Sequence, residues 1–153
     1  MDDRISRLTT PEECEQVALN VETRLPELAR EARRRAVELR AAVHGATSKA
    51  EREALEAVYA YEKVRSVQKG KNVHASRTWQ MIKRHGIIKA VEKCVDRSKE
   101  TAGYKALVDM GMQDLAFEAV VCRHPSVFST EALKRSQARL KEWQPVKAES
   151  KKE

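Results

Sequence analysis

Positive charge is concentrated in one part of this sequence. Between Lys63 and Lys99 there are 11 lysine and arginine residues. Only Glu92 and Asp96 oppose them, so the segment has a net charge of +9 in a chain whose total is +7. A local block of like charge repels itself and is most easily tolerated beside a polyanion. The leading candidate is the phosphate backbone of a nucleic acid, which lysine and arginine bind with release of counterions.

Two neighbouring parts of this block have the composition of a phosphate-binding surface. Residues 69–77 contain Gly70 and are predicted to form a mobile basic loop that leads into the N-terminus of a helix. A helix N-terminus favours phosphate groups, although a solvated linker would have the same composition. His74 is a further donor in this loop. The predicted phosphate ligands of the loop and of the helices after it are Lys69, Lys71, Asn72, Ser76, Arg77, Lys83, Arg84, Lys89 and Lys93.

The segment 77–97 is predicted to form two short helices around a turn at Gly86, the first of them capped by Ser76. Such a pair can place its second helix in the major groove of DNA, as in a helix–turn–helix. The match is imperfect, because Ile82 stands where a small residue is usual and Glu92 where an apolar one is usual. Two alternatives stay open: a basic hairpin that grips phosphate without reading base sequence, and a charged face that is merely solvated.

Gly86 is predicted to adopt the left-handed conformation in which many helices end. A β-branched residue should be destabilising there, and asparagine should be tolerated better, because it enters the left-handed region more readily. Gly45, Gly70 and Gly111 also follow amphipathic runs and are predicted to end helices in the same way.

Other candidate groups favour structural roles. Trp79 and Tyr104 could stack on bases, but their spacing with aliphatic residues is more typical of a core. His85 and His124 lie at predicted helix ends and are interpreted as capping or surface groups. A second arginine cluster is flanked by glutamates one helical turn away, which predicts ion pairs on an exposed helix face. Its members are Arg30, Arg33, Arg34, Arg35 and Arg40.

The sequence carries no recognised catalytic or metal-binding motif. It has no glycine-rich phosphate loop after a strand and no carboxylate cluster with metal spacing. The pairs Glu62-Lys63 and Glu92-Lys93 have the residue types of nuclease sites, but no sheet is predicted to support them. We therefore expect no enzyme, no cofactor and no metal site.

Length and composition predict one all-helical domain. The 153 residues are 41% hydrophobic and 35% charged, which suits a charge-rich globular protein with a buried core. No apolar run reaches the roughly 18–20 residues that span a bilayer, and the acidic N-terminus does not resemble a signal peptide. Cys14, Cys94 and Cys122 lie in apolar helical patterns and are expected to be buried and reduced, as in the cytoplasm.

Apolar spacing and capping signals divide residues 1–145 into helices, without strand-like alternation. Thr10 with Pro11, Ser48 with Glu51, and Ser129 mark helix starts. We predict a compact all-α bundle of about seven or eight helices. Its parts are a helical hairpin over 10–44, a long helix over 48–68, the basic helix–turn–helix over 76–98, a packing hairpin over 101–123, a C-terminal helix over 129–143 and a disordered tail over 146–153.

A faint internal repeat relates the two hairpins when Gly86 is aligned with Gly111. Each unit is predicted as a short helix with an aromatic residue, a glycine turn and a longer helix, the last of these over 112–122 in the second unit. The first unit is basic around its turn, whereas the second is not. The second unit is therefore predicted to serve packing and the first to face solvent.

These features favour a cytoplasmic, bacterial nucleic-acid-binding protein with a regulatory or accessory role, and duplex DNA is the preferred partner. The alternative is a helical interaction module that docks an acidic protein. The alanine- and arginine-rich helices near the N-terminus could also pair with a second copy of the chain. Competition by a random DNA duplex separates nucleic-acid binding from binding of an acidic protein.

Overall fold

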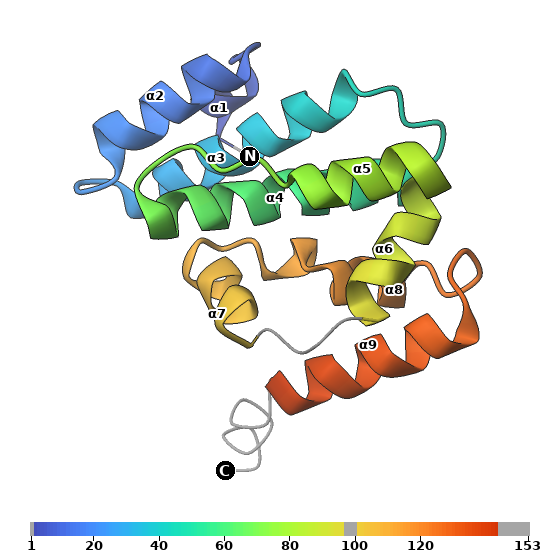
Figure 1. The fold of residues 1–153 in the computed structure, drawn as a ribbon. Helices are drawn as coiled ribbons and strands as arrows, with labels where there is room; N and C mark the ends of the chain where they lie inside the picture. The colour runs from blue at the N-terminus through green and yellow to red at the C-terminus, as the bar shows by residue number, and fades with distance from the viewer. Residues whose placement is uncertain (1, 97–100, 144–153) are drawn as a thin grey trace.

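The computed structural model describes residues 2–96 and 101–143, and within these ranges the chain is helical and has no strand (Figure 1). The predicted all-α class is confirmed, whereas the predicted tail over 146–153 lies outside the described residues. The helices are α1 (Asp3–Ser6), α2 (Pro11–Val21), α3 (Pro26–Ala42), α4 (Lys49–Lys69), α5 (Ser76–His85), α6 (Ile87–Asp96), α7 (Thr101–Asp109), the 3₁₀-helix η1 (Gln113–Leu115), α8 (Phe117–Arg123) and α9 (Thr130–Trp143).

Three predicted capping residues begin helices in the structure. The Thr10 hydroxyl accepts a hydrogen bond from the Glu13 amide at 3.1 Å, with Pro11 at the first helical position of α2. The Ser48 hydroxyl does the same for Glu51 at the start of α4, and Ser129 caps α9. Such caps satisfy amide groups that have no partner inside the helix.

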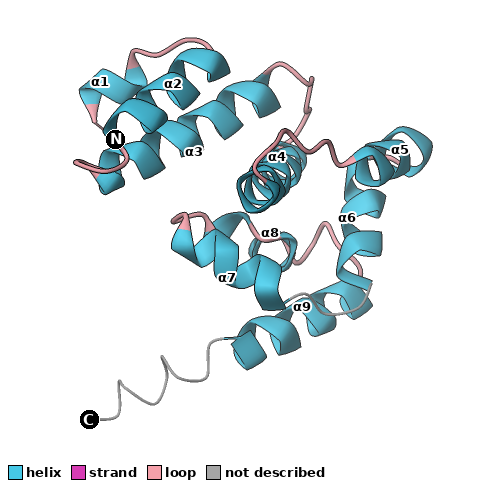
Figure 2. Cartoon of the chain, turned by 60° about the vertical axis from the view of Figure 1, so that its left-hand side comes forward, coloured by secondary structure: helices cyan, strands magenta, loops and turns pink. Residues whose placement is uncertain are grey.

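Helix α4 lies at the centre of the fold. Figure 2 shows it nearly along its axis, with α3 on one side, α5 and α6 on the other, and α7 and α8 below. It packs against α3, α6, α7, η1 and α8. Its buried side chains are therefore spread around the helix rather than confined to one stripe; they are Ala50, Ala54, Leu55, Ala57, Val58, Ala60 and Val64.

The N-terminal helices pack beside α4 as a separate layer. Helices α2 and α3 lie against each other, and Ala18, Ala29 and Ala32 are buried between them. These small side chains allow the two helices to approach closely. The short helix α1, which the sequence did not predict, adds the buried Ile5 to this cluster.

The helix predicted over 112–122 is present only from Phe117 onward, as α8, and its first half is wrong. The chain instead forms η1, becomes extended at Ala116 with φ −62° and ψ 145°, and only then enters α8. The Asp114 carbonyl accepts a hydrogen bond from Arg123 Nη1 at 2.7 Å, so it is diverted from a regular helical bond. Tertiary contacts therefore outweigh local helix propensity in this segment.

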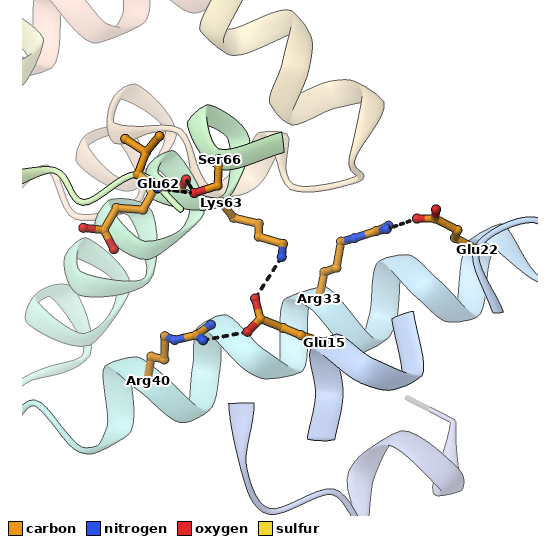
Figure 3. Close-up of polar contacts among 8 residues, drawn as sticks. Glu15, Glu22, Arg33, Arg40, Glu62, Lys63 and Ser66 are labelled. Carbon is orange, nitrogen blue, oxygen red and sulfur yellow. Dashed lines mark hydrogen bonds and ion pairs between the residues drawn. The ribbon is translucent and has the colours of Figure 1, made fainter. Parts of the chain in front are cut away.

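The carboxylate of Glu15 joins three helices (Figure 3). Its two oxygens accept hydrogen bonds from Arg40 on α3 at 2.7 Å and from Lys63 on α4 at 2.8 Å. Burial alone would raise the pKa of Glu15, but the hydrogen bonds and charges of Arg40 and Lys63 outweigh it and lower the pKa. Glu15 therefore stabilises the fold as an anion.

We predict that Glu15→Gln lowers the free energy of unfolding by about 1 kcal/mol at neutral pH, because the ion pairs with Arg40 and Lys63 are lost. Because the pKa of Glu15 is lowered in the folded state, its ion pairs stabilise the protein fully at pH values above the ordinary glutamate pKa of about 4.3. This stabilisation is lost as the pH falls through the pKa of the folded state. The difference between wild type and variant should therefore shrink in acid. Urea unfolding across pH measures it, with the exposed Glu12→Gln on the same helix as control; an equal loss in both variants would contradict the role of Glu15.

Candidate nucleic-acid interface

The structure places all nine predicted phosphate ligands at the molecular surface. Each has an exposed side chain, and they follow one another from the end of α4 through the loop and α5 to α6. Arg97 and Lys99, the last cations of the basic block, lie outside the described residues. Exposure along one continuous stretch is what a phosphate-binding surface requires.

The loop before α5 is held by α4, although the sequence predicted a mobile segment. The Ser66 hydroxyl accepts a hydrogen bond from the Val73 amide at 2.8 Å and donates to the Glu62 carbonyl at 2.7 Å (Figure 3). The Glu62 carboxylate accepts from the Ala75 amide at 2.7 Å and lies 3.2 Å from His74 Nδ1. Two side chains of α4 therefore hold the second half of the loop.

The predicted capping role of Ser76 is wrong. Ser76 is the first residue of α5, Ala75 occupies the capping position, and no side chain of the cap bonds the helix. The Glu62 carboxylate beside this end, bonded to the Ala75 amide, supplies a negative charge near the helix N-terminus. A distant glutamate thus replaces the local cap that the sequence suggested.

Trp79 is enclosed by its neighbours, as the core interpretation predicted. Its Nε1 donates to the Glu62 carboxylate at 2.7 Å. The rings of His44 and Tyr59 lie 5.0 Å from its centroid, and the ring of His74 lies 6.2 Å away and nearly parallel. Since three rings surround the indole, it is not presented as a free stacking platform for a base.

Helix α5 carries cations on the side opposite its buried residues. Thr78 and Ile82 are buried one turn apart, whereas Arg77 and Arg84 stand two turns apart on the exposed side beside Lys83. Together with Lys69 at the end of α4 and Lys71 in the loop, these residues form what we call the α5 basic surface. None of its members makes an ion pair or a side-chain hydrogen bond within the described part of the chain; they are Lys69, Lys71, Arg77, Lys83 and Arg84.

Gly86 alone connects α5 to α6, and the two helices meet at a corner rather than as an antiparallel hairpin (Figure 1). Its φ of +90° confirms the predicted positive value, as do those of Gly45, Gly70 and Gly111. Its ψ of 165°, however, lies outside the left-handed helical region that the sequence predicted. Essentially only glycine occupies this region, so the left-handed conformation on which the expected tolerance of asparagine rested is absent at Gly86.

Helix α6 is less available to DNA than a recognition helix. It contacts α4, α5, α8 and α9 and buries Ala90, Val91 and Val95. Its lysines, Lys89 and Lys93, border a groove of about 210 Å³ against the start of α9. The other charged residues that line this groove are Glu92, Asp96, Glu131 and Arg135.

The charges in this groove balance one another. Glu92 Oε1 lies 3.9 Å from Lys89 Nζ, and its Oε2 accepts from the Ser129 amide at 2.6 Å. Asp96 forms an ion pair with Arg135 of α9. Acidic groups thus accompany the lysines of α6, in contrast to the α5 basic surface.

Lys63 and the arginines of α3 are half-buried and bonded to other groups of the protein. Lys63 is half-buried against Glu15 and contributes no free surface charge. The predicted ion pairs within the helix are present for Arg30 with Glu27 and for Arg35 with Glu38, whereas most other contacts of the cluster are with other segments. Arg30 pairs with Glu27 and donates to the Asp109 carbonyl, Arg33 pairs with Glu22, Arg34 with Asp114, Arg35 donates to the Leu8 carbonyl, and Arg40 pairs with Glu15.

The remaining candidates take structural positions. Tyr104 is buried, His85 is exposed at the end of α5, and His124 Nε2 lies 3.0 Å from Glu53 Oε1. No disulfide joins the three cysteines; Cys14 is buried, and the other two are partly buried. Among the described residues, no group of three or more potential metal ligands occurs, and no helix has the length and apolar character to cross a membrane.

No family model, curated protein or solved structure matches this chain. The functional argument therefore depends on the residues themselves. Sequence analysis missed the roles of two glutamates: Glu62 positions the loop, and Glu15 binds Lys63. Nothing in their spacing distinguishes them from other helical glutamates.

We predict that asparagine is tolerated at Gly70 but not at Gly86. Both positions leave open space for a Cβ atom, but Gly70 has the left-handed values φ 67° and ψ 21°. Gly70→Asn should change the free energy of unfolding by less than about 0.5 kcal/mol, whereas Gly86→Asn should cost about 1–3 kcal/mol. Thermal melts of the two variants measure this difference, and equal stability would mean that the corner at Gly86 is absent.

We predict that Glu62→Ala lowers the free energy of unfolding by about 1.5–3 kcal/mol, because hydrogen bonds to a charged acceptor are lost. The Trp79 indole N–H should also exchange faster with solvent, which NMR detects. Glu56→Ala on the same helix is the control. Burial and the nearby Glu38 and Glu53 raise the pKa of Glu56, so removing it should not destabilise the fold; a loss equal to that of Glu62→Ala would contradict the anchoring role.

Proposed function

We propose that this chain binds nucleic acid through phosphate contacts of the α5 basic surface, with duplex DNA as the preferred ligand. The observation that supports this proposal is the contrast between two cation clusters. The arginines of α3 are engaged by carboxylates and carbonyls, whereas the five cations of the α5 basic surface are exposed and make no ion pair within the described residues. Unpaired exposed cations are those that phosphate groups neutralise with counterion release.

The arrangement of the cations favours a duplex. Lys69 and Lys71 precede α5, and Lys83 and Arg84 lie at its far end. A ten-residue helix is about 15 Å long, and duplex DNA presents roughly nine phosphate charges over that distance. Binding of a single strand relies on open aromatic platforms, and Trp79 is covered by the rings around it.

The proposed contacts do not read base sequence. Direct readout requires side chains that reach base edges in a groove, usually from a helix that is free to enter it. Helix α6 is packed against four other helices, and its lysines share their groove with acidic residues. Of the interpretations left open by the sequence, a surface that grips phosphate fits best, and it suits an accessory or regulatory role.

We predict that replacing Arg77, Lys83 and Arg84 together by alanine weakens binding to a random duplex and flattens its salt dependence. Five phosphate contacts give a slope of about −4.5 in log K against log salt, and three fewer contacts bring it to about −1.8. Fluorescence anisotropy with a labelled duplex at several salt concentrations measures both slopes. An unchanged slope would place the binding surface elsewhere.

A matched control removes the same charge from other helices. Lys105, Lys134 and Lys141 are exposed on α7 and α9, and their triple alanine variant should keep the wild-type slope. An equal loss in the control would mean that only net charge matters.

The competing function is binding of an acidic protein partner, and a polyglutamate peptide tests it. Two results together would favour this function: the peptide displaces the duplex, and an excess of random duplex fails to displace the peptide.

A further inference from the structure

Three of the four histidines lie around α5, where the α5 basic surface is. His74 precedes the helix, His85 is its last residue, and His44 comes from the turn between α3 and α4. The His44 ring stacks on that of Trp79 with centroids 5.0 Å apart, which brings this turn against α5. Histidine is the side chain that ordinarily gains and loses a proton between pH 5 and 8. The charge near the cations of α5 therefore depends on pH.

Two of the four histidines are paired with carboxylates. His74 Nδ1 lies 3.2 Å from Glu62 Oε2, and His124 Nε2 lies 3.0 Å from Glu53 Oε1. A proton on either ring is balanced by a negative charge within the protein. It therefore adds little to the attraction of an external anion.

His44 and His85 have no such partner. Both are exposed, and neither makes an ion pair or a side-chain hydrogen bond within residues 2–96 and 101–143. His85 follows Thr78 by two helical turns, so it projects from the side of α5 that carries this buried residue and not from the side of Arg77 and Arg84. Of the four histidines, His44 therefore remains as an unpaired ring next to the α5 basic surface.

The stack places His44 beside Lys83. Trp79 and Lys83 are four residues apart on α5, so their side chains are neighbours on the helix surface. Lys83 is exposed, and so is His44 on the adjacent indole. A phosphate group held by Lys83 therefore lies near the His44 ring, and its negative charge favours the protonated form.

The surroundings of the stack accept a cation at His44. The face of an indole attracts a cation that lies on it, and His44 follows the C-terminus of α3, where the helix dipole favours positive charge. Burial raises the pKa of Tyr59, which packs on Trp79, so this phenol stays neutral. The charged side chains nearby have other partners: Glu62 is bonded to Trp79 and Ala75, Arg40 to Glu15, and Glu51 to Thr47.

We propose that His44 is a proton-dependent ligand of the α5 basic surface. In its protonated form it contributes one further cation to the binding of phosphate groups, so the chain binds a duplex more tightly at pH 6 than at pH 8. The proton comes from the solvent, and it favours duplex binding to the same degree as the duplex favours the proton. This inference rests on the proposed binding of nucleic acid by the same surface.

Fluorescence anisotropy with a random duplex at pH 6 and pH 8, at one salt concentration, tests the proposal. Wild type should bind about three- to tenfold more tightly at pH 6, and its slope of log K against log salt should be steeper there by about 0.9, the value for one further phosphate contact. Equal affinities and slopes at the two pH values would overturn this inference alone. Absence of duplex binding at both would overturn the proposed function and this inference with it.

Two substitutions at His44 separate its charge from its packing. His44→Gln should lose most of the difference between pH 6 and pH 8 and keep the wild-type affinity at pH 8. His44→Lys carries its charge at both pH values and should bind tightly at both. A weak His44→Lys variant with the wild-type melting temperature would overturn the proposal, because the positive charge would then not be the cause.

The other histidines supply matched controls. His74→Gln, His85→Gln and His124→Gln should each keep most of the wild-type pH dependence, because their rings are paired with a carboxylate or lie off the basic surface. Calorimetry of duplex binding at pH 7 in two buffers of different ionisation enthalpy should show net proton uptake by wild type and less by His44→Gln. Loss of the pH dependence in one of the controls but not in His44→Gln would overturn the assignment to His44.

Discussion

The burial of α4 is the constraint on which the other helices depend. Seven of its 21 residues are buried, and most of them are alanine or valine. A helix with buried side chains spread around its axis cannot be stable on a single flat surface, because each apolar face needs its own partner. Helix α3 covers one side, α6 and α8 another, and α7 with η1 a third. The small alanine side chains let these partners approach α4 closely, so the positions of the outer helices follow from the surface of this one helix.

Acidic side chains at the joints between helices decide which cations remain available. Glu15 takes up Arg40 and Lys63, Asp114 takes up Arg34, and Glu53 binds Arg123 and His124. Partial burial would raise the pKa of each of these carboxyl groups, but the adjacent cations lower it, so all three remain charged where the helices meet. The cations that they bind serve structure. Glu62 lies beside α5, but its carboxylate is bonded to Ala75 and Trp79 rather than to the cations of the α5 basic surface.

The sequence predicts what depends on neighbouring residues. Threonine and serine caps, proline at a first helical turn and glycine after an amphipathic run all act within a few residues, and Thr10, Ser48 and Gly70 behave accordingly. The same logic fails where a distant group wins. Ser76 loses its capping role to an arrangement built around Glu62, 13 residues before Ala75.

The candidate sites show the same division between local and distant effects. The basic composition of the loop and α5 is visible in the sequence, but the removal of Lys63 by Glu15 depends on a contact across 48 positions. The helix predicted over 112–122 is interrupted at Ala116, two residues after Asp114, which is bonded to Arg34 across 80 positions. The stack of His44 on Trp79 has no sequence signal either, because it joins the turn after α3 to α5.

The proposed coupling between protonation of His44 and binding of a polyanion acts through charge and not through a change of shape. A conformational coupling requires two conformations that each ligand distinguishes. The start of α5 is held by the Glu62 carboxylate through Ala75 and Trp79, and its end is joined by one glycine to α6, which four helices contact. Because both ends of α5 are fixed in this way, the proton acts as one more cation at the surface, and its effect on affinity should fade as salt screens exposed charges. A coupling that persisted at high salt would require the bonds to Glu62 to break.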